Sequence, residues 1–226
     1  DEIDEALMAE AVEQAKAAKA AVIFAGLPDA FESEGFDRGH MRMPNCQNEL
    51  IARVAAAQPN TIVVLHNGSP VEMPWADQVK GIVEAYLGGQ AVGGAQVDIL
   101  FGKVNPSAKL PESFPYKLED NPSYLYYVGE GDRVEYREGV FVGYRYYDTK
   151  KMDVRFPFGF GLSYTDFEIT PDRFIYDDKI KITVTVKNSG NTAGKEVLQV
   201  YVCCPDGRLK KAEKSLVAFA KTRCLA

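Results

Sequence analysis

Histidine and tryptophan are scarce in this sequence, which has two histidines and one tryptophan among its 226 residues. His40 and His66 stand alone, with no carboxylate at the spacing of a metal-binding motif. A protein metal site needs several ligands that converge on one ion, so we expect no metal here and assign both histidines structural roles. Trp75 follows Pro74 at the start of a predicted helix or turn, and we interpret it as a packing anchor.

Cysteine is sparse too, and its spacing matches neither a disulfide framework nor a metal-binding motif. The four residues are Cys46, Cys203, Cys204 and Cys224. We interpret them as free thiols, which favours a reducing compartment. A cytoplasmic location is therefore expected, with secretion as the alternative. The sequence shows no signal-peptide pattern, but this carries little weight because we expect the natural start of the chain to lie upstream.

Clusters of basic residues and long apolar runs are absent as well. The net charge is −6 and the isoelectric point is near 5.1, so nucleic acid and anionic membrane surfaces are not expected partners. No stretch reaches the roughly 18 to 20 apolar residues that a spanning helix needs. Hydrophobic residues still make up 46% of the sequence, which supports a sizeable core and a soluble, globular protein.

Short apolar runs alternate with amphipathic stretches in the first hundred residues. Continuous apolar runs predict buried strands over residues 20–25, 61–65 and 81–87. Helical spacing predicts helices over residues 3–16, from a cap at Asn45 or Asn48 to Ala57, and over residues 92–100. This alternation favours an α/β fold, with an open, mostly parallel sheet covered by helices on both faces, an αβα sandwich.

A glycine-rich segment at residues 88–94 precedes the last of these helices, where backbone N–H groups can bind a phosphate. It has neither the lysine and hydroxyl of a Walker loop nor the spacing of a dinucleotide fingerprint. Tight packing between strand and helix is the better interpretation, and no nucleotide or other cofactor is expected.

The rest of the chain changes character twice. Residues 105–164 are rich in proline, glycine and tyrosine and predict a long aromatic loop region that packs against its surroundings. Apolar and polar residues then alternate over 180–187, a turn follows at 188–191, and a second strand is predicted at 197–202. We therefore expect two domains, an α/β domain at 1–165 that lacks its N-terminal part and an incomplete β-sandwich at 166–226.

The acidic loop at residues 31–41 is the strongest functional candidate. It follows a predicted strand, at the end where α/β proteins keep their binding and catalytic residues. Four of its eleven residues are charged, namely Glu32, Glu34, Asp37 and Arg38. A carboxylate in this loop could be a general acid, a metal ligand or a solvated surface charge, and composition alone does not choose among them.

Several motifs together resemble glycoside hydrolase family 3, the β-glucosidase family. They are Glu34–Arg38, Asn67–Val71, Met73–Trp75, Asn105–Pro111, Glu138–Tyr147 and Phe158–Thr165. In addition, Val184–Gly190 with Gly194–Val197 resembles the fibronectin-III-like domain that follows in many members. The resemblance covers nearly the whole chain. It implies that a (β/α)8-type barrel, which carries the nucleophilic aspartate in this family, is missing from these 226 residues. The barrel is expected elsewhere in the same protein or in another chain.

The resemblance also implies a role for the acidic loop. Retaining glycosidases use two carboxyl groups, one as nucleophile and one as acid/base, and in this family the acid/base often lies in a motif similar to Glu34–Arg38 on a mobile loop. Glu34 is thus the expected catalytic residue, with Phe31 and Phe36 expected to desolvate it. Glu32, Asp37 and Arg38 are expected to bind substrate or position the loop, with Arg38 paired to Asp37.

Two functions remain open at this point. The first is the acid/base-bearing part of a retaining β-glucosidase-like enzyme that acts on terminal β-linked sugars of a β-glucoside or oligosaccharide, and that is inactive as an isolated chain. The second is a non-catalytic accessory module or fragment whose aromatic loops bind carbohydrate or protein. In either case His40, His66 or Trp75 could contact a sugar, although packing is the more common role of such residues.

Overall fold

The computed structural model describes residues 2–205 and 207–226. Contacts group the chain into two compact units. The first comprises the residues through Gln96 together with Phe114–Tyr124, and the second comprises Val97–Ser113 with Leu125–Ala226. The domain boundary expected after residue 165 stays a prediction, and each unit is described by itself.

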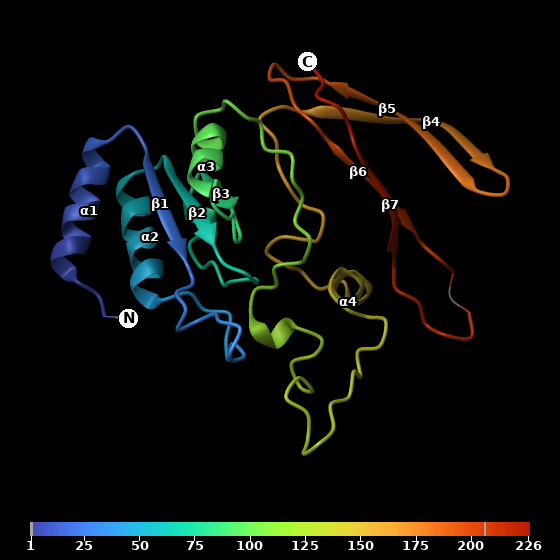
Figure 1. Ribbon diagram of the computed structural model, residues 1–226, viewed down its shortest axis with the longest axis horizontal. Coiled ribbons are helices and arrows are strands. Elements are labelled where there is room, and N and C mark those ends of the chain that lie inside the picture. Colours follow the sequence, from blue (N-terminus) through green and yellow to red (C-terminus); the bar gives the residue numbers. More distant parts are fainter. Residues whose placement is uncertain (1, 206) are drawn as a thin grey trace. The chain divides into compact units, whose positions relative to one another are not determined.

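The first unit is built on a three-stranded parallel sheet in the order β1-β2-β3 (Figure 1). Its elements are α1 (Glu5–Ala17), β1 (Ala21–Gly26), α2 (Asn45–Ala57), β2 (Thr61–His66), β3 (Gly81–Glu84) and the start of α3 (Val92–Leu100). Helix α1 packs against α2, and α2 packs against β1 and β2. The predicted α/β class with a parallel sheet is confirmed.

Strand β2 forms the centre of the core. Val63, Val64 and Leu65 are completely inaccessible to solvent, as expected for a central parallel strand covered on both faces. Ile51 of α2 is also fully buried and lies in this core. Trp75 is 1% exposed, and its Nε1 donates a hydrogen bond of 2.9 Å to Oδ1 of Asn48. Trp75 is therefore a packing residue, as predicted.

Strand β1 differs from its prediction as a strand buried on both faces. It pairs with β2 alone and lies at the edge of the sheet. Its residues alternate in burial, with Val22 42% and Phe24 58% exposed. The continuous apolar run thus predicted the strand correctly but not its burial. Composition does not tell which face of a strand is covered by other elements.

Two predicted boundaries also require correction. Helix α2 begins at Asn45 after Pro44 at the N-cap, and no side chain caps it, so neither Asn45 nor Asn48 has the predicted capping role. Strand β3 ends at Glu84, earlier than the predicted residue 87. Tyr86 lies just beyond with a φ of 48°, a left-handed conformation that no strand continues through.

The second unit contains two antiparallel pairs of strands, β4 with β5 and β6 with β7. Their bounds are Phe167–Tyr176, Ile180–Asn188, Val197–Val202 and Ser215–Lys221, and a short helix, α4 (Tyr144–Lys150), precedes them. Strands β5 and β6 were predicted. Strands β4 and β7 and helix α4 were not, because proline interrupts β4 and the tyrosine-rich α4 has no clear apolar period.

The alternating pattern of β5 is only partly realised as burial. Val184 and Val186 are half-buried, whereas Ile180 is 53% and Ile182 is 39% exposed. The predicted half-buried strand is therefore correct for its second half alone. A largely buried ion pair lies near β6, where Lys109 Nζ is 2.8 Å from Glu196 Oε1 and donates to the carbonyl oxygen of Gly161 at 2.7 Å.

Within residues 2–205 and 207–226, no helix is both long enough and apolar enough to cross a membrane.

The core of the first unit makes a quantitative prediction. Ile51→Ala removes a fully buried side chain next to β2 and leaves a cavity, so it is expected to destabilise the fold by about 2–5 kcal/mol. Leu7→Ala is the control, because Leu7 of α1 is 63% exposed and its truncation should cost well under about 1 kcal/mol. Urea unfolding measures both, and equal effects would contradict this description of the core.

Candidate functional site

Two loops meet at the carboxyl edge of the parallel sheet. Residues 27–44 follow β1 and residues 67–75 follow β2, and the two strands end in register, with Gly26 opposite His66. Figure 1 shows both loops leaving the sheet at the end to which the arrows of β1 and β2 point. The acidic loop predicted from sequence therefore lies where parallel sheets place their functional groups.

Glu34 lies at the tip of the first loop. Ser33 and Phe36 form an isolated antiparallel bridge, so Glu34 and Gly35 occupy the turn between them. Glu34 is exposed and Phe36 is 48% exposed. The expected desolvation of Glu34 by Phe31 and Phe36 is therefore not supplied by this loop, because the residue stays exposed to water beside both rings.

Glu32 anchors the base of the same loop. Its carboxylate accepts hydrogen bonds from the backbone N–H of Gly68 at 2.6 Å and from the hydroxyl of Ser69 at 2.7 Å. A Cβ atom on Gly68 would lie 3.2 Å from the carboxylate carbon and both its oxygens, closer than ordinary side-chain contacts. The missing side chain of Gly68 thus makes room for Glu32.

Arg38 approaches the same turn from the other side of the loop tip. Its Nη1 donates to Ser69 Oγ at 2.7 Å and to the carbonyl oxygen of Pro70 at 3.2 Å, and it lies 3.8 Å from Glu32 Oε1. Burial lowers the pKa of the Arg38 guanidinium, while the negative charges of Glu32 and Glu72 act in the opposite direction. The guanidinium remains charged, because the pKa of arginine lies far above neutral pH.

Further contacts fix the loop and its receiving turn. The carbonyl oxygen of Met41 accepts a 2.8 Å hydrogen bond from the backbone N–H of Glu72, and the rings of Phe31 and His40 meet edge to face at 5.7 Å. The buried Asn67 donates to the carbonyl oxygen of Ser69 at 2.9 Å. Loop and turn are therefore joined at several points, and Glu34 projects beyond them.

The four predicted site residues differ in their contacts and in their exposure to solvent. Glu32 and Arg38 converge on Ser69, whereas Glu34 and Asp37 are exposed. The expected pairing of Arg38 with Asp37 stays a prediction. The sequence analysis placed Gly68 and Ser69 within the motif Asn67–Val71 but gave neither a role in the site. The signal available was that parallel strands bring their carboxyl ends to one edge.

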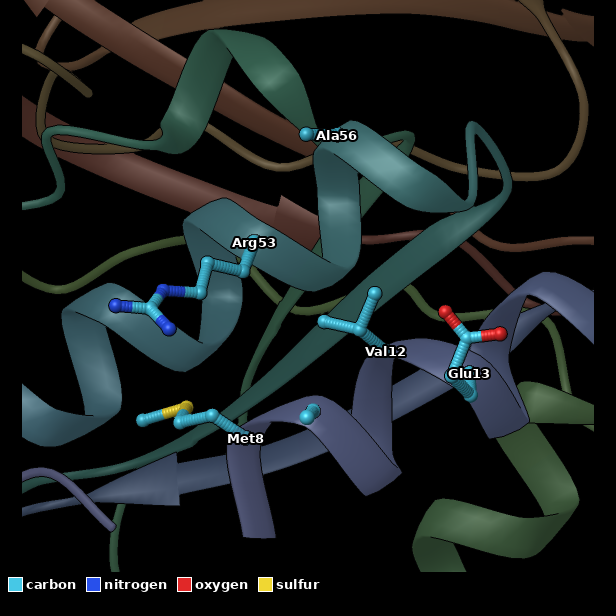
Figure 2. A pocket seen from close by; sticks show the side chains of 6 residues that line it. Met8, Val12, Glu13, Arg53 and Ala56 are labelled. Atoms are coloured by element: carbon cyan, nitrogen blue, oxygen red, sulfur yellow. The ribbon is translucent and has the colours of Figure 1, made fainter. Parts of the chain in front are cut away.

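The remaining candidates show no convergent chemistry. His66 Nε2 lies 2.7 Å from the Nε2 of Gln96, and within the described ranges no three His, Cys, Asp or Glu residues are grouped to hold a metal ion. A hollow of about 400 Å³ opens between α1 and α2 and is lined by Met8, Ala9, Val12, Glu13, Arg53 and Ala56 (Figure 2). Its charged groups are already paired, Glu13 with Lys16 and Arg53 with Glu5 and Glu49.

Comparison with known proteins places this geometry in a family. The model of the glycosyl hydrolase family 3 C-terminal domain matches residues 2–164. Thermostable beta-glucosidase B of Acetivibrio thermocellus is 58% identical over 98% of this chain and 30% of its own length. A probable beta-glucosidase I of Aspergillus terreus is 47% identical over 96% of this chain and 27% of its own length.

Solved structures agree with these relatives. A beta-glucosidase from Kluyveromyces marxianus superposes with a TM-score of 0.94 at 43% identity, over 100% of this chain and 27% of that one. A family 3 beta-glucosidase from Bifidobacterium adolescentis has the same TM-score at 45% identity, over 100% of this chain and 34% of that one. This chain thus spans about a third or less of the relatives that it matches. With a matching domain model over most of its length and close relatives along all of it, the chain belongs to glycosyl hydrolase family 3, whose C-terminal domain it carries.

Proposed function

We propose that this chain is the acid/base-bearing part of a retaining β-glucosidase, and that Glu34 is the acid/base. The observation that carries the proposal is the form of the loop, in which an exposed carboxylate projects from a base fixed to the sheet edge by Glu32 and Arg38. The relatives named above are β-glucosidases. Nothing in these comparisons supports the alternative of a non-catalytic module.

The proposed chemistry requires a second carboxyl group. In retaining hydrolysis the two groups lie about 5–5.5 Å apart, the nucleophile attacks the anomeric carbon, and the acid protonates the leaving oxygen. Glu34 then takes a proton from the water that releases the sugar. The nucleophile is proposed to be an aspartate of a (β/α)8-type barrel in the remainder of the protein or in another chain.

The exposure of Glu34 is consistent with an active site whose other half lies in the barrel. A working acid must be held partly protonated near its operating pH, and loss of contact with water favours the protonated form of a carboxyl group. The loop alone leaves Glu34 in water. The rest of the active site and the bound sugar would therefore supply the desolvation, so that the acid becomes effective when substrate is in place.

The proposed substrates are β-glucosides and oligosaccharides with a terminal β-linked sugar. A cytoplasmic location is proposed as well, and the four free cysteines support it. Cell fractionation checks this, since recovery of the protein outside the cell would contradict it.

The first functional prediction concerns Glu34→Ala in the complete enzyme. We expect kcat/KM for aryl β-glucosides with poor leaving groups to fall by about 10²- to 10⁴-fold, because these substrates need protonation as the bond breaks. For substrates with activated leaving groups kcat/KM should stay nearly normal, because the first step no longer needs an acid, whereas kcat should fall because the second step has lost its base. Azide should partly restore that kcat, because it replaces water in the second step without needing a base. Steady-state kinetics across a series of leaving groups measures the effect.

Glu10→Ala is the matched control, since Glu10 is an exposed glutamate of α1 whose carboxylate accepts a hydrogen bond of 2.8 Å from Gln14 Nε2. Its kinetics should equal those of the unmodified enzyme, with no response to azide. Unchanged turnover in Glu34→Ala would remove Glu34 from the acid/base role.

The second functional prediction concerns this chain alone. Expressed as residues 1–226, it should not hydrolyse p-nitrophenyl β-glucoside, because an acid without its nucleophile lacks half of the mechanism. The complete enzyme under the same conditions is the positive control. Hydrolysis by the purified chain, with no other protein found by intact mass, would show that the nucleophile lies within these residues.

A further inference from the structure

We infer that Ser69 is a positioning residue for the acid/base loop, acting through its hydroxyl on Glu32 and Arg38. The inference rests on the proposed role of Glu34 and identifies a side chain that helps to fix the position of the Glu34 carboxylate. It concerns the turn after β2, which neither the motif pattern nor the relatives' names assign to catalysis.

The hydroxyl of Ser69 joins both sides of the loop. It donates to Glu32 Oε1 at 2.7 Å and accepts from Arg38 Nη1 at 2.7 Å. A serine hydroxyl has one hydrogen to donate and two lone pairs to accept with, so it can serve a carboxylate and a guanidinium at once. Both partners are charged, and hydrogen bonds of this kind are about twice as strong as neutral ones.

These two attachments bracket the loop tip closely. Glu32 precedes Glu34 by two residues and Arg38 follows it by four. Because an extended chain spans at most about 3.6 Å per residue, Glu34 can lie no more than roughly 7 Å from the Cα atom of its first anchor. A displacement of Glu32 or Arg38 therefore displaces Glu34 as well, because few residues separate them.

Ser69 is itself held in place by the sheet. It lies three residues beyond the end of β2, whose residues Val63, Val64 and Leu65 are in the buried core. The side chain of Asn67, 1% exposed, donates to the Ser69 carbonyl oxygen at 2.9 Å. Pro70 follows and restricts the backbone. The hydroxyl thus adds a connection between a rigid element and the acidic loop, close to the residues on either side of Glu34.

A direct role for Ser69 in binding sugar is less consistent with its contacts. Its single hydrogen is already given to Glu32, and donation to a sugar would break that bond. The positional role has a clear energetic basis, since a general acid must come within about 2.6–3.2 Å of the leaving oxygen. A displacement of about 1 Å in such a geometry can cost on the order of 10²-fold in rate.

The test uses the complete enzyme and the variants Ser69→Ala, Glu34→Ala and their combination, with aryl β-glucosides of poor and of activated leaving group. Ser69→Ala should lower kcat on poor leaving groups by about tenfold, below the limit for a 1 Å displacement. KM on the poor leaving groups and kcat/KM on the activated ones should change by less than about twofold. In the Glu34→Ala background, Ser69→Ala should have no further effect, because a positioning residue cannot act once the group it positions is gone.

Two further variants complete the design. Ser69→Thr keeps a hydroxyl and should restore most of the lost rate. Ser123→Ala is the matched control, because Ser123 is also half-buried and its hydroxyl bonds only locally to Asn121 Oδ1 at 2.8 Å. It should match the unmodified enzyme in kinetics and in thermal midpoint.

Three results would overturn the inference. The first is an equal loss on both classes of substrate, which would indicate general damage to the fold. The second is unchanged kinetics in Ser69→Ala while Glu34→Ala shows its selective loss, which would leave the proposed function intact. The third is a full Ser69→Ala effect in the Glu34→Ala background. If Glu34→Ala itself shows no selective loss, the proposed function fails first, and the two failures are thereby distinguished.

Discussion

The hydrogen bonds between the Glu32 carboxylate and the turn at Gly68 and Ser69 are the interaction on which the site depends. They join two loops that leave neighbouring parallel strands in register. Arg38 and the backbone contact of Met41 with Glu72 tie the same loop to the turn as well. The carboxylate is only partly exposed, so water competes weakly for these bonds.

The site separates rigid and accessible parts. Glu32 and Arg38 have side-chain exposures of 24% and 14%, and they balance each other's charge near the edge of the core. Glu34 lies two residues beyond this pair and is open to solvent. Because Glu32 and Glu34 point to different environments, two chemically identical side chains serve different purposes. One holds the backbone in place, and the other is available to react with a ligand.

The sequence predicted the α/β elements well and the contacts of the site poorly. Uninterrupted apolar runs such as Thr61–Leu65 leave little choice of structure, so β2 was found almost to the residue. The exposure of Phe24 could not be predicted, because it depends on what covers the sheet. The hydrogen-bond acceptors of Arg38, Ser69 and Pro70, lie more than 30 positions away, and local patterns carry no information about such distant pairs. The motif containing Glu34 was found by resemblance, while Ser69 required coordinates.

The bare Cα of Gly68 has a consequence for loop engineering. Because a Cβ atom there would lie only 3.2 Å from the Glu32 carboxylate and force it to shift, the acidic loop and the turn that receives it must match as a pair. Exchanging residues 27–44 between members of the family would transfer the acid without its support unless residues 67–70 were exchanged with them. These two segments, distant in the chain, form a single transplantable module.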